Sequence, residues 1–354
     1  MTRLLVLPGD GIGPEITAAT IAVVRAATGG SVTFDEMAIG EASLAASGST
    51  LPDAVMAAVP QADGVILGPV SHYTYPAGQP NPSAALRTGF QLYANVRPCR
   101  SREGLSILRQ PMDLVIVREN TEGFYADRSM YAGPGEFMPD ADSAFSIRKI
   151  TALASRRVAR AACEIAAARS GKLTVVHKAN VLKLTDGLFL REVRTVAAEF
   201  PTVTLDEVIV DAAAALLVRD PARFDVIVTT NMFGDILSDE ASELSGSLGL
   251  GGSINAGDDI CVAQAQHGSA PDIAGKGVAN PTSLILSASM LLEWLSIKHK
   301  KDSFAAAHRA IEDALDSVLK DPARRTPDLG GSVGTKAFTE SLCREIESKN
   351  TQAA

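Results

Sequence analysis

Cysteine, aromatic residues and uninterrupted hydrophobic runs are all scarce in this sequence of 354 residues. The cysteines lie far apart and form no CxxC pair or Cys/His cluster, which argues against a disulfide framework and a structural zinc site. They are Cys99, Cys163, Cys261 and Cys343. The most apolar long stretch, residues 283–297, contains Glu293 and is too short to cross a bilayer, so we expect no membrane association.

Positive charge is also in the minority. The chain has 33 Lys and Arg residues against 41 Asp and Glu residues, a formal net charge of -8, so we expect no basic face for nucleic acid. The first residues enter an apolar strand and a turn, a pattern unlike that of a signal peptide. These features indicate a soluble, cytoplasmic, globular protein, and the length suggests two domains.

Short β-branched runs alternate with longer Ala- and Leu-rich segments, which is typical of an α/β fold with a largely parallel sheet. The strands are expected at residues 3–7, 64–67, 114–117, 173–176 and 224–229. Helices are expected at 151–168, closed by Gly171, and directly after Asn280 and Pro281. Each strand ends in a Gly-rich or charged tip. Because ligands bind beyond the carboxyl ends of strands in open α/β sheets, these tips predict a composite site.

The glycine-rich turn after the first strand does not fit a Rossmann fingerprint. Gly13 comes one residue too early for GxGxxG, and Pro14 follows it. No acidic residue closes a second strand about twenty residues later, as that fingerprint requires. The simpler interpretation is a tight strand-to-helix turn, so we reject a Rossmann fold.

Two aspartates, Asp235 and Asp239, lie four residues apart in an expected helix, which places both carboxylates on one face. Either they interact favourably with the positive N-terminus of that helix, or they bind Mg²⁺ or Mn²⁺. Asp211, after the apolar run 208–210, could supply a third carboxylate.

Other polar side chains leave similar alternatives. Arg87, Arg97 and Arg118 could bind carboxylates through their planar guanidinium groups, although each could equally be structural. Lys178 could be an exposed lysine or a proton shuttle. Tyr125 could be a packed aromatic residue or a general acid.

The stretch HGSAPDIAGKGVANP, residues 267–281, is rich in small residues that would allow a phosphate to approach the backbone. Asp272 within it could accept hydrogen bonds from ribose hydroxyls. An ordinary Gly-rich surface loop is the alternative.

Together these motifs resemble the metal-dependent β-decarboxylating dehydrogenases, which act on isocitrate, 3-isopropylmalate, homoisocitrate, and tartrate or D-malate. The resemblance covers nearly the whole chain and is carried, in the family's order, by LPGDGIGPEI, LYANVRP, RENTEGFY, HKANVLK, NMFGDILSDEAS and HGSAPDIAGKGVANP. It implies an isopropylmalate-dehydrogenase-like two-domain α/β fold. Residues 1–92 plus 246–354 would form a discontinuous, large cofactor-binding domain, and residues 93–245 a small central domain with the dimer interface.

The resemblance also implies site roles. Arg87, Arg97 and Arg118 would bind the substrate carboxylates. Mg²⁺ or Mn²⁺ would be held by Asp211, Asp235 and Asp239. Lys178 would accept the hydroxyl proton while hydride passes to the nicotinamide, and Tyr125 would protonate the enolate left by loss of CO2. In the implied homodimer, Lys178 and Asp211 would reach into the partner's site.

By the same resemblance, the residue after HGSAP determines the choice of cofactor. Family members with an acidic residue at that position use NAD. This chain has Asp272, whose carboxylate would accept a hydrogen bond from the ribose 2′-OH and repel a 2′-phosphate. We therefore predict NAD. The implied cofactor-binding residues are His267, Gly268, Ser269, Ala270, Pro271, Asp272 and Asn280.

The resemblance implies that the substrate is a (2R)-hydroxy acid of the 3-substituted malate type, with isocitrate favoured. Isopropylmalate enzymes place two leucines where this chain has Ser83 and Ala84, and isocitrate enzymes have a Ser-x-Asn pair that Asn81 and Ser83 resemble in exchanged order. The alternatives are 3-isopropylmalate, D-malate and tartrate. A non-catalytic regulatory subunit is a remote alternative, since such subunits typically lose a metal carboxylate, the lysine or the tyrosine.

Two segments depart from the family pattern. Residues 263–266 read Ala-Gln-Ala-Gln where the family commonly has Phe-Glu-Pro-Val. An insert at residues 128–142 follows Tyr125 and could shape dimer contacts or specificity.

Overall fold

The computed structural model describes residues 1–108, 110–125 and 130–353. Its strands are β1 (Thr2–Leu7), β2 (Val32–Glu36), β3 (Gly64–Leu67), β4 (Ala94–Arg100), β5 (Asp113–Glu119), β6 (Glu136–Asp140), β7 (Ser143–Ser146), β8 (Lys172–His177), β9 (Thr204–Ile209), β10 (Val226–Thr229), β11 (Ile254–Ala256) and β12 (Cys261–Gln264). Its helices are α1 (Gly13–Thr28), α2 (Gly40–Ser47), α3 (Asp53–Ala58), α4 (Pro82–Gly89), α5 (Ala152–Ala168), α6 (Thr185–Ala197), α7 (Val210–Arg219), α8 (Asn231–Ser245), α9 (Thr282–His299), α10 (Asp302–Lys320) and α11 (Thr335–Ala353).

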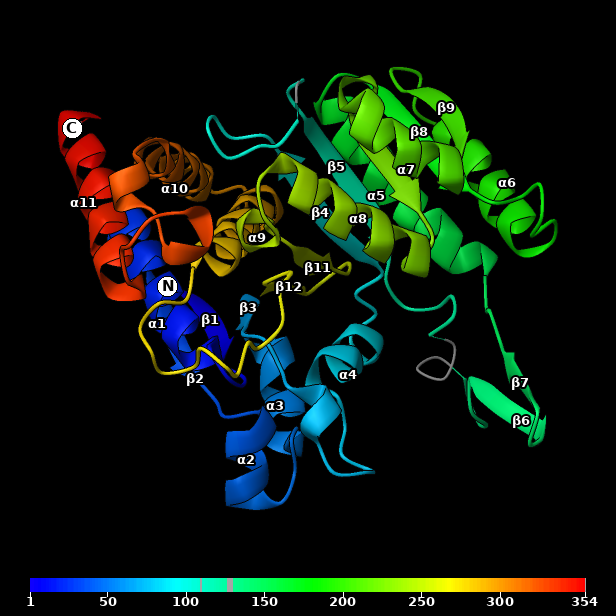
Figure 1. Ribbon diagram of the computed structural model, residues 1–354, viewed down its shortest axis with the longest axis horizontal. Coiled ribbons are helices and arrows are strands. Elements are labelled where there is room, and N and C mark those ends of the chain that lie inside the picture. The colour runs from blue at the N-terminus through cyan, green and yellow to red at the C-terminus, as the bar shows by residue number, and fades with distance from the viewer. Residues whose placement is uncertain (109, 126–129, 354) are drawn as a thin grey trace.

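A ten-stranded mixed sheet runs through the described residues in the order β2-β1-β3-β12-β11-β4-β5-β10-β8-β9 (Figure 1). Its pairs are parallel except β12 with β11, β11 with β4, and β4 with β5. The largely parallel α/β sheet expected from the sequence is therefore confirmed. The inner strands β3 and β10 are buried along their whole length, as continuous apolar runs in a covered sheet must be.

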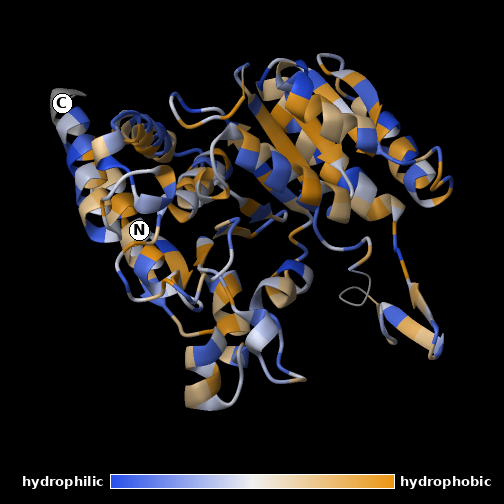
Figure 2. Cartoon of the chain, viewed as in Figure 1, coloured by the Kyte–Doolittle hydropathy of each residue, from blue (hydrophilic) through white to orange (hydrophobic). Residues whose placement is uncertain are grey.

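Helices cover both faces of the sheet. Along β5, Val115 and Val117 pack into the core beneath α5, whereas Leu114 and Ile116 pack into the core beneath α7 and α8. At the other end of the sheet, α1 packs against α9, α10 and α11. Figure 2 shows the resulting pattern, with hydrophobic strands inside and helices of mixed character around them.

The strands expected from the sequence are all present, with small shifts at their ends. The last of them begins at Val226 instead of 224, because residues 221–223 form a 3-10 turn in which Phe224 N donates to Pro221 O at 3.1 Å. The helix expected at 151–168 is α5, with Thr151 as its N-cap. Arg169 is its C-cap, so the expected closure at Gly171 is corrected: Gly171 lies beyond the cap, at φ +77°.

The expected tight turn after β1 is confirmed. Gly9 and Gly11 have positive φ values of +74° and +57°, and α1 begins directly at Gly13. A Cβ on Gly9 would lie 2.2 Å from the oxygen of Pro69, and one on Gly11 would lie 2.0 Å from the oxygen of Ser269. The glycines therefore bring three loops into close contact at one edge of the sheet.

The apolar stretch 283–297 lies within α9 and is mostly buried. The helix follows Asn280 and Pro281 as expected, but Pro281 is its N-cap residue and not part of its first turn. Asn280 Oδ1 accepts a hydrogen bond from Thr282 N at 3.0 Å. Among the helices of the described residues, none combines the length and apolar character needed to cross a membrane.

Strands from residues 93–245 occupy one end of the sheet, and strands from the two ends of the chain occupy the other. The two groups join where β11 pairs with β4 over three residue pairs, centred on Asn255 and Asn95. The predicted domain boundaries, at 92/93 and 245/246, lie shortly before β4 and at the end of α8, and the division into two domains stays a prediction.

A two-stranded arm, β6 and β7, projects from the body of the molecule (Figure 1). Every residue of β6 is exposed, and the rings of Phe137 and Phe145 stack at 5.3 Å. The insert predicted at 128–142 lies partly outside the described residues, and its described part contains β6.

Candidate active site

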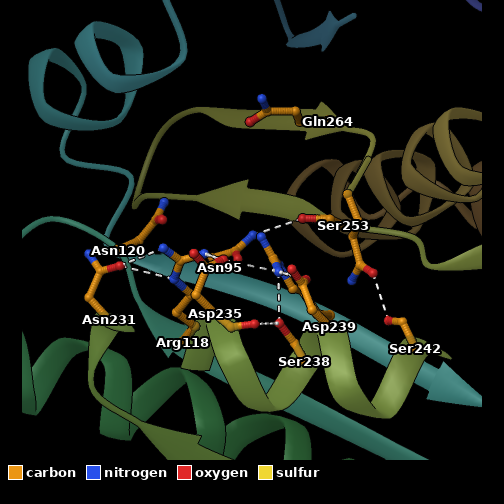
Figure 3. Close-up of polar contacts among 12 residues, drawn as sticks. Asn95, Arg118, Asn120, Asn231, Asp235, Ser238, Asp239, Ser242, Ser253 and Gln264 are labelled. Atoms are coloured by element: carbon orange, nitrogen blue, oxygen red, sulfur yellow. Dashed lines mark hydrogen bonds and ion pairs between the residues drawn. The ribbon is translucent and has the colours of Figure 1, made fainter. Parts of the chain in front are cut away.

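The centre of the candidate site is the contact between helix α8 and strands β4 and β5 (Figure 3). From β4, buried Arg97 extends to α8, where its Nη1 lies 3.0 Å from Asp239 Oδ1 and 3.4 Å from Asp235 Oδ1. The same nitrogen donates to Ser238 Oγ at 2.7 Å. One guanidinium thus contacts both predicted metal carboxylates.

Arg118 approaches the same helix from the end of β5. Its Nε and Nη2 donate to Asn231 Oδ1 at 3.0 and 2.6 Å, and its Nη1 pairs with Asp235. Burial lowers the pKa of Arg118 to about 10, with Arg97 acting in the same direction, so the side chain stays protonated at neutral pH. Gly234 permits this contact, because a Cβ there would lie 2.7 Å from Arg118 Cβ.

Asp235 and Asp239 share one face of α8, as their spacing predicts. The helix begins at Asn231, so both lie beyond its first turn, where the helix dipole has little effect. Their favourable interaction with the helix N-terminus is therefore excluded as the explanation. Burial raises the pKa of Asp239, although Arg97 acts in the opposite direction.

Tyr125 lies beside this cluster. Its hydroxyl donates to Asp235 Oδ2 at 3.4 Å, and its ring centre is 6.0 Å from the guanidinium carbon of Arg118. The structure therefore brings together five predicted site residues: Arg97, Arg118, Tyr125, Asp235 and Asp239.

Lys178 and Asp211 form a second group. Lys178 follows β8, Asp211 lies in the first turn of α7, and their side chains form an ion pair. The hydrogen bond from Lys178 lowers the pKa of Asp211. Within the described part of one chain, this pair contacts neither Asp235 nor Asp239, and no cluster of three metal-binding side chains forms.

The third arginine, Arg87, lies on α4 and contacts a residue that sequence reasoning did not select. Its Nη2 donates to Gln264 Oε1 at 3.2 Å, and Ser83 Oγ donates to the same oxygen at 3.1 Å. Asn81 is the N-cap of α4, with its side-chain oxygen accepting from Ala84 N at 3.3 Å. The sequence marked Gln264 only as part of the departure at 263–266.

Gln264 also begins a ladder of side-chain amides. Asn255 Nδ2 donates to Gln264 Oε1 at 3.2 Å, and Asn120 Nδ2 donates to Asn255 Oδ1 at 3.0 Å. The ladder runs from β12 across β11 to the residue after β5. It therefore connects the environment of Arg87 with the tip that carries Arg118.

Two buried glutamates anchor the segment before Tyr125. Glu119 Oε1 accepts from Thr121 N at 2.7 Å, and Glu122 Oε1 accepts from Thr151 N at 2.7 Å. Burial raises the pKa of Glu122 to about 7. Neither glutamate was selected from the sequence, although Glu119 ends β5 directly after Arg118 and Glu122 follows three residues later.

The predicted cofactor loop, residues 267–272, packs against the turn after β1. Ile12 N donates to Ser269 O, and Ser71 Oγ to Ser269 Oγ, both at 2.8 Å. Burial lowers the pKa of His267, whereas the Asp272 side chain lies at the surface. Asn280 Nδ2 donates to the carboxylate of Asp328 at 2.9 Å, which sequence reasoning did not select.

Comparison with known proteins identifies the family. Residues 3–346 match the family model for isocitrate/isopropylmalate dehydrogenase. The chain is 43% identical over 348 residues to the isocitrate/homoisocitrate dehydrogenase of Thermus thermophilus, a match that covers 98% of this chain and 99% of that protein. It is 39% identical over 343 residues to the 3-isopropylmalate dehydrogenase of Saccharolobus solfataricus, covering 96% of this chain and 98% of that protein.

Among solved structures, the isocitrate dehydrogenase from Methylococcus capsulatus matches with a TM-score of 0.87 and 41% identity, covering 98% of this chain and 100% of that one. The chain belongs to the isocitrate/isopropylmalate dehydrogenase family of oxidoreductases. The resemblance drawn from the sequence motifs is confirmed, as are the isopropylmalate-dehydrogenase-like fold and the rejection of a Rossmann fold.

Proposed function

We propose that this protein catalyses the NAD-dependent oxidative decarboxylation of a (2R)-hydroxy acid of the 3-substituted malate type, with isocitrate as the favoured substrate. The observation that carries the proposal is the cluster on α8, where two buried arginines and a tyrosine meet two carboxylates. Arg97 and Arg118 supply donors for the carboxylates of an anionic substrate, and Arg87 would bind a further one.

Asp235 and Asp239 fit a divalent cation, because Mg²⁺ and Mn²⁺ prefer carboxylate oxygens and the two side chains are 34% and 52% exposed. Asp211 of a second subunit would complete the ligand set. When bound, the ion would polarise the substrate oxygens as a Lewis acid. Arg97 and Arg118 now pair with these carboxylates, and the carboxylates of a bound substrate would draw the arginines away and leave both aspartates available to a cation.

Lys178 and Tyr125 would transfer the protons. Lys178, ion-paired with Asp211, would accept the proton of the substrate hydroxyl as hydride leaves for the nicotinamide. Tyr125 would then deliver a proton to the carbon from which CO2 departs. Its hydroxyl already donates to Asp235, which orients it toward the cluster.

The cofactor loop supports NAD over NADP. The Asp272 carboxylate lies at the surface of this loop, where it can accept hydrogen bonds from the ribose and would repel a 2′-phosphate. The neighbouring residues His267, Gly268, Ser269, Ala270 and Pro271 would line the cofactor site, together with Asn280.

The residues around Arg87 support a polar 3-substituent. Ser83 and Arg87 both donate to Gln264, so this part of the site offers hydrogen bonds where an isopropyl group would need apolar contacts. A carboxylate substituent, as in isocitrate, suits it better. The curated relatives act on isocitrate or homoisocitrate in one case and on 3-isopropylmalate in another, so 3-isopropylmalate stays the main alternative.

A homodimer accounts for the separation of Lys178 and Asp211 from the α8 cluster. Large apolar side chains are exposed within the stretch 93–245 that also carries this pair, and a partner subunit could cover them. They include Leu153 on α5, Val181 and Leu184 before α6, Val218 on α7 and Ile236 on α8.

The experiment is a substrate panel of isocitrate, homoisocitrate, 3-isopropylmalate, D-malate and tartrate with NAD or NADP, with and without Mn²⁺. We expect Mn²⁺-dependent reduction of NAD, fastest with isocitrate. Asp235→Asn should weaken Mn²⁺ binding measured by calorimetry, whereas Asp113→Asn, a surface carboxylate paired with Arg169, should not. Failure of every panel member to reduce either cofactor would refute the proposal.

A further inference from the structure

A buried ion pair joins the segments that carry the two proposed proton-transfer residues. Arg148 lies just before α5, and Asp186 lies in the first turn of α6. Arg148 Nη1 is 2.5 Å from Asp186 Oδ1, and the two side chains are only 7% and 0% exposed. Taking two charges out of water is costly, so such a pair is weak evidence for stability alone and calls for another explanation.

On one side, the pair fixes the chain at Lys178. Asp186 Oδ2 accepts a hydrogen bond from Lys178 N at 2.5 Å, which holds the backbone from which the lysine side chain extends. Arg148 Nη1 also donates to Thr185 Oγ1 at 2.7 Å, so the start of α6 is held at the same point.

On the other side, Arg148 holds the start of α8 and the residue before Tyr125. Its Nη2 donates to Thr230 Oγ1, the N-cap of α8, at 3.0 Å. Its guanidinium carbon lies 5.7 Å from the ring centre of Phe124 and 5.4 Å from that of Phe233. Guanidinium stacking on two rings restricts both aromatic residues.

Backbone hydrogen bonds strengthen this arrangement. Gly123 N donates to Lys149 O at 2.8 Å, and Lys149 N donates to Gly123 O at 3.0 Å, an antiparallel bridge directly beside Arg148 and Phe124. The segment that ends in Tyr125 is therefore attached to Arg148 through its backbone as well as through a ring.

We propose that Arg148 and Asp186 are positioning residues that set the placement of Lys178, Tyr125 and α8 together. The inference rests on the proposed function. If Lys178 serves the partner's site, the pair also connects the two sites of the dimer, because Tyr125 and Asp235 serve the site of their own subunit.

Two variants test the pair. Arg148→Lys keeps the charge but removes the planar group that stacks on Phe124 and Phe233 and reaches Thr230. Arg148→Met/Asp186→Leu removes both charges at similar volume, a change that folded proteins often tolerate. Arg156→Lys is the matched control, since Arg156 also pairs across α5 and α6, with Glu192 at 2.8 Å, but is 51% exposed.

The measurements are kcat and KM on the holoenzyme with Mn²⁺, NAD and isocitrate, the pH profile of kcat, and amide hydrogen exchange. We expect kcat to fall about tenfold or more in both variants, since small misplacements of reacting groups are costly. KM should change much less, the pH profile should shift as Lys178 loses its placement, and exchange should rise in residues 120–125 and 177–180. Arg156→Lys should match the wild type in each measurement.

A folded double variant with wild-type kcat and exchange would overturn the proposal. If the double variant does not fold, Arg148→Lys alone tests the proposal, and a wild-type kcat in Arg148→Lys would overturn it. If the wild type turns over no panel substrate, the proposed function fails separately. The exchange measurement then still tests the pair, and unchanged exchange in both segments refutes it.

Discussion

At the scale of the residue, Gln264 shows how an uncharged side chain can organise a cationic site. Its amide oxygen accepts hydrogen bonds from Ser83, Arg87 and Asn255. Because an amide carries no net charge, Gln264 orients Arg87 without cancelling the positive charge that the proposed anionic substrate would require. The departure from the family pattern at residues 263–266 thus has a structural meaning.

Gln264→Leu should raise the KM for isocitrate about tenfold, because hydrogen bonds to charged groups contribute about 1.5–3 kcal/mol. The kcat should stay within about threefold of the wild type, since binding and not proton transfer is affected. Steady-state kinetics with saturating NAD and Mn²⁺ provide the measurement. Gln266→Leu is the control: Gln266 Oε1 accepts from Ser242 at 2.7 Å, away from Arg87. Equal KM values for both variants would contradict the assigned role.

Single residues were predictable where local spacing determines their placement. The i, i+4 spacing of Asp235 and Asp239 was enough to place both on one face of a helix. Gln264 and Asn255 could not be found in this way, because they meet through the antiparallel pairing of β12 with β11, which brings Ile254 opposite Ala263. Strand register of this kind depends on tertiary contacts.

At the scale of the element, α8 includes a glycine that helix propensity disfavours. Gly234 lies inside the helix, where Ala would ordinarily be about 1 kcal/mol better. Its position against Arg118 explains the choice, because the nearest atoms to an added Cβ are Arg118 Cβ and Cγ, both at 2.7 Å. These atoms are close to the backbone and cannot move easily.

Gly234→Ala should therefore lower the free energy of unfolding by about 1–3 kcal/mol, the usual cost of overpacking, despite the gain in propensity. Gly187→Ala is the control in α6, where an added Cβ meets nothing within 4 Å. It should leave stability unchanged or raise it by up to about 1 kcal/mol. Urea unfolding of both variants measures the difference. A stabilised Gly234→Ala protein would show that the Arg118 side chain can move away from the added Cβ.

Strands with continuous apolar runs in the buried sheet were predictable, and strands without such a run were not. The strands expected from β-branched runs are all present because they are central and covered on both faces. Strand β11 has only three residues, and its pairing with β4 and β12 depends on chain segments far away in the sequence. The arm β6–β7 carries no buried face that could produce a periodic pattern.

At the scale of the whole molecule, the separation of Lys178 from Tyr125 makes the proposed sharing of sites testable by mixing subunits. Homodimers of Lys178→Ala and of Tyr125→Phe should each be nearly inactive. A random mixture of the two subunits should regain about a quarter of wild-type activity, because half of its dimers contain one intact site of two.

The measurement is the initial rate after the two variants are unfolded, mixed and refolded together. Refolding each variant alone is the control. A mixture no more active than its parents would show that Lys178 and Tyr125 act within one subunit. Because the mixed dimers contain the same substitutions as the parents, a difference in folding cannot explain a recovery.

The order of strands in the sheet also determines which part of the sheet can form first during translation. Strands β4, β5, β8, β9 and β10 and helices α5 to α8 come from one continuous stretch, so they can pair as soon as it is synthesised. Strand β3 cannot pair with β12, and α1 cannot pack against α9, α10 and α11, until the last third of the chain has been synthesised. The first three strands therefore have an unpaired edge during most of translation, and they are the part of the nascent chain that longest needs protection from aggregation.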